Sequence, residues 1–143
     1  EKYSHKEIRR RMAPPKLVAL SQAFLSAAEP AEPPSPKKDS VRWGKYVENA
    51  CLSHAWNSGQ QVYYWREEPL EVDGVFIGAW GKWAVEVKTG PYTYRDLGGL
   101  TEFCRRYPEF KPLVICDANH VSVAAQVNVK CLSWNKFLLN SLS

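Results

Sequence analysis

The stretch Glu71-Val-Asp-Gly-Val-Phe-Ile-Gly-Ala-Trp-Gly-Lys-Trp-Ala-Val-Glu-Val-Lys88 decides how this chain folds. Its alternating apolar residues predict two antiparallel strands. Gly78 and Gly81 bracket Ala79-Trp80, which suits the short connection of a β-hairpin. The sequence therefore predicts a hairpin over residues 70–88, with Trp80 exposed at the tip of its turn.

The register of this hairpin decides which side chains meet. An even loop centred on the turn places Asp73 opposite Glu86 and Glu71 opposite Lys88, and residues two apart share a face of the strand. All four polar groups then project from one side, and the opposite, core-facing side carries Val72, Phe76, Val85 and Val87. An odd loop or a bulge at Gly81 would instead separate Asp73 from Glu86.

Two facing carboxylates are unfavourable unless something neutralises them. At about 5 Å and an effective dielectric constant of about 20, their repulsion is about 3 kcal/mol. A divalent cation such as Mg²⁺ or Mn²⁺ is the expected solution, because carboxylate oxygens are its preferred ligands. Lys88 is the alternative, since it can hold the acids together without metal.

The rest of the chain surrounds this hairpin with helices and strands. A proline-rich segment, Glu29–Lys38, excludes helix and reads as a linker. It belongs to an N-terminal part over residues 1–39, which precedes a domain over residues 40–143. His54 lies on an apolar helical stripe and is expected to be packed. The predicted elements are a strand at Lys16–Leu20, a helix at Ser21–Ala28, a helix capped by Ser40 and ending near Asn57, a strand at Gln61–Arg66, a helix over residues 94–107 opened by Thr93 and Asp96, strands at Leu113–Cys116 and residues 129–132, and a helix at Trp134–Leu142 capped by Ser133. This alternation predicts an α/β fold with a mixed central sheet flanked by helices on both sides.

Composition excludes several classes of protein. The chain has 143 residues, of which 45% are hydrophobic and 24% charged, as in a globular domain. No apolar run approaches the roughly 20 residues of a membrane span, and the N-terminus does not resemble a signal peptide. Four dispersed cysteines fit buried thiols in a reducing cytoplasm better than a zinc site, with disulfides as the alternative. The net charge of +4 is compatible with nucleic-acid binding.

The order of polar residues carries a family resemblance. Glu48 on a helix, Asp73 on a strand and Glu86-Val87-Lys88 on the next strand resemble the motif of the PD-(D/E)xK nucleases, whose fold is restriction-endonuclease-like. One branch of that superfamily is also similar in its flanking segments, over roughly residues 14–140. It is the uncharacterised domain that follows the AAA+ module in a class of prokaryotic ATPases. The segments are Trp43-Gly-Lys-Tyr-Val-Glu-Asn-Ala50, Val62-Tyr-Tyr-Trp-Arg-Glu67, Glu71-Val-Asp73 and Ala84-Val-Glu-Val-Lys-Thr-Gly90.

The resemblance implies a metal-dependent phosphodiesterase acting on DNA rather than RNA. Glu48, Asp73, Glu86 and Lys88 would be the catalytic residues. The metal, Mg²⁺ or Mn²⁺, would be held by Asp73, Glu86, the carbonyl of Val87 and Glu48, while Lys88 would orient water and offset phosphate charge. An AAA+ ATPase module upstream is the implied partner, and such nucleases often work as dimers. A catalytically inactive nucleic-acid-binding or regulatory domain of an ATPase is the alternative.

Four basic residues flank the helix predicted over residues 94–107, namely Arg95, Arg105, Arg106 and Lys111. They could contact nucleic-acid phosphates, and a solvated face of the helix is the alternative.

Overall fold

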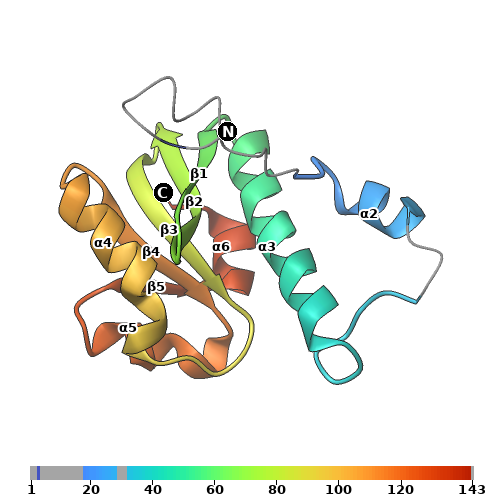
Figure 1. The fold of residues 1–143 in the computed structure, drawn as a ribbon. Helices are drawn as coiled ribbons and strands as arrows, with labels where there is room; N and C mark the ends of the chain where they lie inside the picture. The colour runs from blue at the N-terminus through green and yellow to red at the C-terminus, as the bar shows by residue number, and fades with distance from the viewer. Residues whose placement is uncertain (1–2, 4–17, 29–31, 143) are drawn as a thin grey trace.

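The computed structural model describes residue 3, residues 18–28 and residues 32–142. These residues form both helices and strands, as the ribbon in Figure 1 shows. The elements are α2 (Gln22–Ala28), α3 (Ser40–Asn57), β1 (Gln61–Glu67), β2 (Leu70–Gly78), β3 (Gly81–Lys88), η1 (Tyr94–Leu97), α4 (Gly98–Arg106), β4 (Lys111–Cys116), η2 (Ala118–His120), α5 (Val121–Ala125), β5 (Lys130–Ser133) and α6 (Trp134–Asn140).

The five strands form one mixed sheet in the order β1-β2-β3-β4-β5. The first three strands are antiparallel to one another, and β3, β4 and β5 run parallel. Helices α4 and α5 cover one face of the sheet, while α3 and α6 cover the other (Figure 1). The expected α/β fold with a mixed sheet between helices is confirmed.

Each face of the sheet has its own hydrophobic core. On the α4 side, Trp65 of β1 and Phe103 of α4 are fully buried and their ring centroids lie 5.6 Å apart. On the α3 side, Phe76 of β2 stacks on Phe137 of α6 at 6.4 Å, and both rings are fully buried. Burial on both faces explains the continuous apolar run of β4.

A glycine sets the distance between α4 and the sheet. A Cβ added to Gly99 would lie 2.0 Å from the backbone oxygen of Glu71, whereas the nearest atom to a Cβ on Gly98 would be 3.9 Å away. Only a residue without a side chain therefore allows α4 to approach β2 this closely.

Trp80 is half-buried, so the expectation that it would be exposed at the turn is wrong. Its ring lies against Phe137 at 5.9 Å and against His54 at 6.0 Å. The packing expected for His54 is confirmed, and its Nε2 also lies 3.0 Å from the Ser141 hydroxyl. The turn folds back because this large apolar ring can complete the core on the α3 side.

Several element boundaries differ from the sequence prediction. Asp39, rather than Ser40, is the N-cap of α3, because its Oδ1 accepts the hydrogen bond of the Arg42 N–H at 3.0 Å. The helix expected over residues 94–107 is divided into the 3-10 turn η1 and α4, and the capping pair of Thr93 and Asp96 opens η1. Residues 18–20 form no strand, and the beginning of that predicted strand lies outside the described residues. The short elements η2 and α5 were not predicted.

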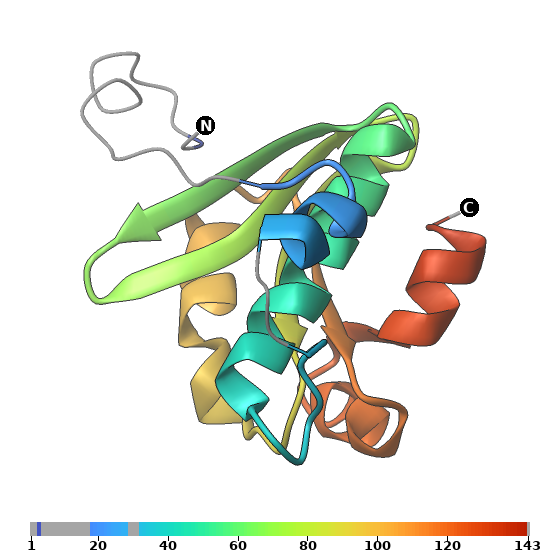
Figure 2. The same ribbon diagram turned by 90° about the vertical axis from the view of Figure 1, so that its right-hand side faces the viewer.

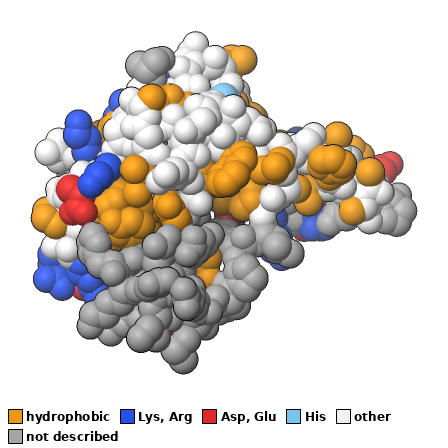
Figure 3. All heavy atoms as spheres, turned by 90° about the horizontal axis from the view of Figure 1, so that it is seen from above, with side chains coloured by type: hydrophobic (Ala, Val, Ile, Leu, Met, Phe, Trp, Pro, Cys, Tyr) orange, Lys and Arg blue, Asp and Glu red, His pale blue; other side chains and the backbone are white. Residues whose placement is uncertain are grey.

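Residues 18–28 lie against α3, as Figure 2 shows. Asn49 of α3 holds this segment, because its side chain both accepts from the Ala19 N–H at 2.8 Å and donates to the Ala19 carbonyl at 2.9 Å. Helix α2 buries none of its residues, and Phe24 is 70% exposed. Figure 3 shows hydrophobic side chains on the surface around this end of the molecule. The boundary proposed at residue 39 stays a prediction.

Candidate functional site

The hairpin of β2 and β3 has the expected register near its turn. Gly78 pairs with Gly81, and the ladder continues to Gly74 opposite Val85. The alternative of a bulge at Gly81 is therefore wrong. The even loop brings the two acidic strand segments to the same end of the hairpin.

A bulge nevertheless interrupts β2 at the candidate site. Tyr63 of β1 pairs with Val75 and Trp65 pairs with Val72, so Asp73 and Gly74 together oppose the single residue between them. Val72 consequently packs with Val75 in the core on the α4 side. The expectation that Val72 would share a face with Phe76 is wrong, because the inserted residue reverses the alternation.

Asp73 connects β2 to β3 beyond the end of their backbone ladder. The Val87 N–H donates to Asp73 Oδ2 at 2.9 Å, just beyond the last backbone pair of Gly74 and Val85. A carboxylate that accepts a backbone hydrogen bond is held in one orientation. Asp73 is thus fixed beside the strand segment that carries Glu86 and Lys88.

Glu86 is a buried acid in the middle of this site. Only 7% of its surface is exposed, and its Oε1 accepts from Lys88 Nζ at 2.7 Å. Its Oε2 is buried without a hydrogen-bond partner. Burial first, and the charge of Asp73 second, raise the pKa of Glu86 to about 8 in spite of Lys88. Glu86 therefore favours a proton or another positive charge at Oε2.

Lys88 is positively charged in this arrangement. Burial opposes its charge, but the carboxylates of Glu86 and Asp73 outweigh burial and hold the pKa of Lys88 above its ordinary value. Glu71, which was expected opposite Lys88, instead pairs with Arg66 across the strands at 3.5 Å. Lys88 instead pairs with Glu86 on its own strand.

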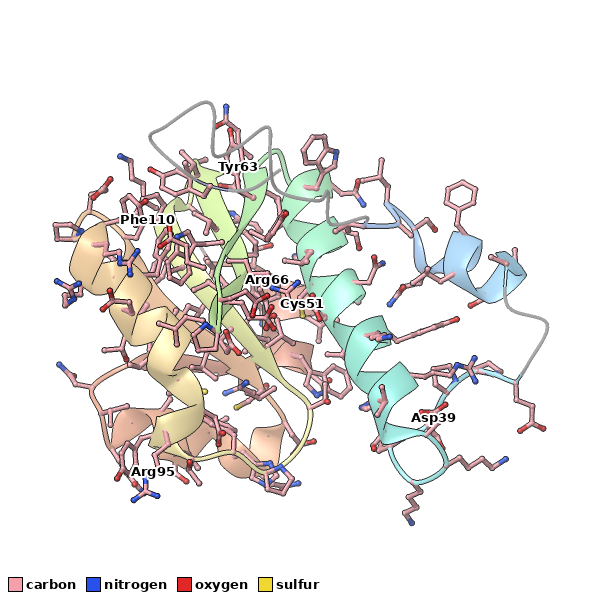
Figure 4. All side chains as sticks on the ribbon, viewed as in Figure 1. Asp39, Cys51, Tyr63, Arg66, Arg95 and Phe110 are labelled. Atoms are coloured by element: carbon pink, nitrogen blue, oxygen red, sulfur yellow. The ribbon has the colours of Figure 1, made fainter. Side chains whose placement is uncertain are left out.

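Glu48 belongs to the α3 side of the site. Burial, with smaller contributions from Glu48 and Asp73, raises the pKa of the buried Cys51 thiol to about 12, so both acids lie within electrostatic range of this cysteine. Figure 4 labels Cys51 on α3, facing the sheet. Cys51 was not predicted to lie near the site, although its position one helical turn after Glu48 could have indicated the proximity.

The metal set predicted from the sequence is gathered only in part. Among the residues that the structure describes, no group of three or more His, Cys, Asp or Glu side chains could hold a metal ion, so Glu48 does not complete a triad with Asp73 and Glu86. Asp73 and Glu86 do fit a hard divalent cation, because they are adjacent and Glu86 Oε2 is buried without a hydrogen bond.

The four basic residues predicted to bind nucleic acid do not form one surface. Arg95 belongs to η1, shortly after the end of β3, whereas Arg105 and Arg106 end α4 and Lys111 begins β4. In Figure 4, Arg95 and Phe110, the neighbour of Lys111, stand at opposite ends of this helix. The ten residues from Arg95 to Arg105 correspond to a separation of about 15 Å along a helix.

The basic residues far from Lys88 already contact neighbouring acids and an aromatic ring. Both Arg105 and Arg106 donate to Glu102, at 2.8 and 2.6 Å. Arg106 also pairs with Glu67 and lies over the Trp65 ring at 5.4 Å. Of the four basic residues, Arg95 is the one placed at the end of the sheet where Lys88 lies.

Comparisons with known proteins identify the family. The domain of unknown function DUF4143 matches residues 43–137, which include every residue of the candidate site. No curated protein and no solved structure matches the chain. Within the described part of the chain, no helix is both long and apolar enough to cross a membrane. The chain therefore belongs to the DUF4143 family, a domain that follows AAA ATPase modules in some prokaryotic proteins.

Proposed function

We propose that this domain is a metal-dependent phosphodiesterase of the PD-(D/E)xK, restriction-endonuclease-like class, and that its substrate is DNA. The observation that carries the proposal is Glu86, a buried acid with an unpartnered Oε2 beside Asp73 and Lys88. A buried carboxylate of this kind is costly unless positive charge neutralises it. Perturbed acids of this type gather at functional sites.

The residues that would hold Mg²⁺ or Mn²⁺ are Asp73, Glu86 and the carbonyl of Val87. When bound, the cation supplies a Lewis acid for a phosphoryl oxygen and lowers the pKa of water. Asp73 is oriented for this role by its hydrogen bond to the Val87 N–H. Glu48 lies outside this set, and we expect it to act through water from α3.

Lys88 would contact the phosphate. Its pKa lies above the ordinary value, so it is a cation at neutral pH and suits charge compensation better than proton abstraction. Arg95 is the basic residue best placed to hold the DNA next to it. We expect the reaction to take place in the cytoplasm, on DNA delivered by an AAA+ module of the same protein.

A nicking assay on supercoiled plasmid with Mn²⁺ tests the proposal. Asp73→Asn is the preferred variant, since its amide oxygen can still accept from the Val87 N–H while the charge is lost. We expect Asp73→Asn and Lys88→Ala to abolish nicking, and Glu71→Gln, an exposed acid on the same strand, to retain it. Nicking that survives in both site variants would exclude these roles.

A second candidate is a regulatory domain without catalysis. The ion pair between Lys88 Nζ and Glu86 Oε1 at 2.7 Å favours it, because Lys88 can neutralise the acid without metal. This candidate predicts no cleavage with either cation and a DNA affinity that Asp73→Asn leaves unchanged. Metal titration by calorimetry separates the two, since heat of binding that disappears in Asp73→Asn supports the enzyme.

A further inference from the structure

Two cysteines that are not among the proposed metal ligands meet on the parallel part of the sheet. Cys116 ends β4 and Cys131 lies in β5, and their sulfur atoms are 3.2 Å apart. A disulfide bond measures about 2.0 Å, so the sulfurs need to approach by about 1.2 Å. Both residues are free thiols in the structure.

The two thiols are unequal in access. Cys116 is fully buried, whereas Cys131 is half-buried on the last strand of the sheet. The Tyr92 hydroxyl lies 3.9 Å from the Cys131 sulfur and donates to the His120 carbonyl at 3.1 Å. An external reagent therefore reaches Cys131 first, and Cys116 stands directly behind it.

Their acidity differs in the same sense, since the hydrogen bond to Cys131 and burial raise the pKa of Cys116. A hydrogen bond from Cys116, assisted by Tyr92 and opposed by burial, lowers the pKa of Cys131 to about 7. Burial raises the pKa of Cys51 to about 12 and that of Cys104 to about 11. Thiolates are the nucleophiles in thiol chemistry, so Cys131 is the reactive cysteine among the four.

We propose that Cys116 and Cys131 form a reversible dithiol–disulfide couple that exchanges with a low-molecular-weight disulfide such as oxidised glutathione. The Cys131 thiolate attacks one sulfur of glutathione disulfide, forms a mixed disulfide and releases one glutathione thiolate. Cys116 then attacks the Cys131 sulfur, and its proton passes to the sulfur of the second glutathione as that group leaves. The protein loses two electrons and two protons, and one glutathione disulfide becomes two glutathione molecules.

The couple is independent of the proposed nuclease activity, but it lies beside the candidate site. Cys116 is the register partner of Lys88 across β3 and β4. Oxidation would link β4 to β5 covalently at this position. It would also move the Cys116 side chain, which neighbours Lys88.

Mass spectrometry of the whole chain in glutathione buffers tests the proposal. The protein is equilibrated at increasing ratios of oxidised to reduced glutathione, quenched with acid, unfolded, alkylated with N-ethylmaleimide and digested. We expect a peptide joining Cys116 to Cys131 to appear, together with the loss of two alkylated thiols. Cys51 and Cys104 are the internal controls and stay alkylated.

Variants at the two positions test the order of attack. Cys116→Ala should trap one glutathione on Cys131, and Cys131→Ala should leave Cys116 unmodified in the folded protein. If Cys116→Ala does not fold, Cys116→Val replaces it, and the linked peptide of the wild type remains decisive. Four alkylated cysteines at every glutathione ratio, or linked peptides that involve Cys51 or Cys104 in equal yield, would overturn the proposal.

Discussion

Replacing Glu86 with glutamine should stabilise the metal-free protein at high pH and have little effect at low pH. The pKa of Glu86 is raised from 4.5 to about 8 by burial and by Asp73. Between these values the folded state binds a proton that the unfolded state has released, so stability falls as the pH rises through this window. At 1.36 kcal/mol per pKa unit, the wild type loses about 3–4 kcal/mol between pH 5 and pH 8 through this group.

Glutamine keeps the shape of the side chain but cannot ionise, so Glu86→Gln escapes this loss. Urea unfolding from pH 5 to pH 9, followed by tryptophan fluorescence with a chelator present, measures the difference between the two proteins. The stability gained by the variant should grow by about 3–4 kcal/mol across the range. The exposed Glu71→Gln control should change by less than about 1 kcal/mol. If the wild type and Glu86→Gln stay separated by a constant free energy at every pH, Glu86 does not have a raised pKa and the electrostatic reasoning fails.

Three further predictions concern the glycine at the helix–sheet contact, the helix cap and the proposed cation. Gly99→Ala should destabilise the protein by about 2 kcal/mol or more, because α4 must move away from β2, whereas Gly98→Ala should be neutral or slightly stabilising in thermal unfolding. Equal effects of the two alanines would contradict the close approach at Gly99. Asp39→Ala should cost about 1 kcal/mol through loss of the α3 cap, and Ser40→Ala, the adjacent control, should cost much less in urea unfolding. At pH 8, Mn²⁺ at 100 times its dissociation constant should stabilise the wild type by about 2.7 kcal/mol, and a shift in Tm retained by Asp73→Asn would argue against that ligand.

The sequence predicted the elements that depend on local patterns. Gly78 and Gly81 located the turn and its even loop, and the apolar run at the end of β4 indicated a strand buried on both faces. The pair of glycines in the helix predicted over residues 94–107 indicated close packing against the sheet, which Gly99 confirms. These features are visible in sequence because each depends on residues close together in the chain.

Features that depend on distant contacts were predicted less well. Asp39 and Ser40 are both good caps, and only the hydrogen bond to Arg42 decides between them. A turn residue such as Trp80 is generally expected to be exposed. In the structure Phe137, from the last helix, packs against the Trp80 ring and makes it part of the core. No pattern in the sequence indicated what β3 bonds to beyond the end of its ladder with β2. There the side chain of Asp73 takes the place of a backbone acceptor.

The structure also changes the reason why the site favours positive charge. From the register alone, the expected cause was repulsion between the facing acids Asp73 and Glu86. In the structure one oxygen of Asp73 accepts from the Val87 N–H, and burial exceeds Asp73 as the cause of the raised pKa of Glu86. Removing Asp73 should therefore relieve only the smaller part of the effect. A cation that binds here must offset the desolvation of a single acid, and Lys88 already satisfies one of its two oxygens. The unpartnered Oε2 of Glu86 is thus the atom at which the catalytic and the regulatory proposals differ.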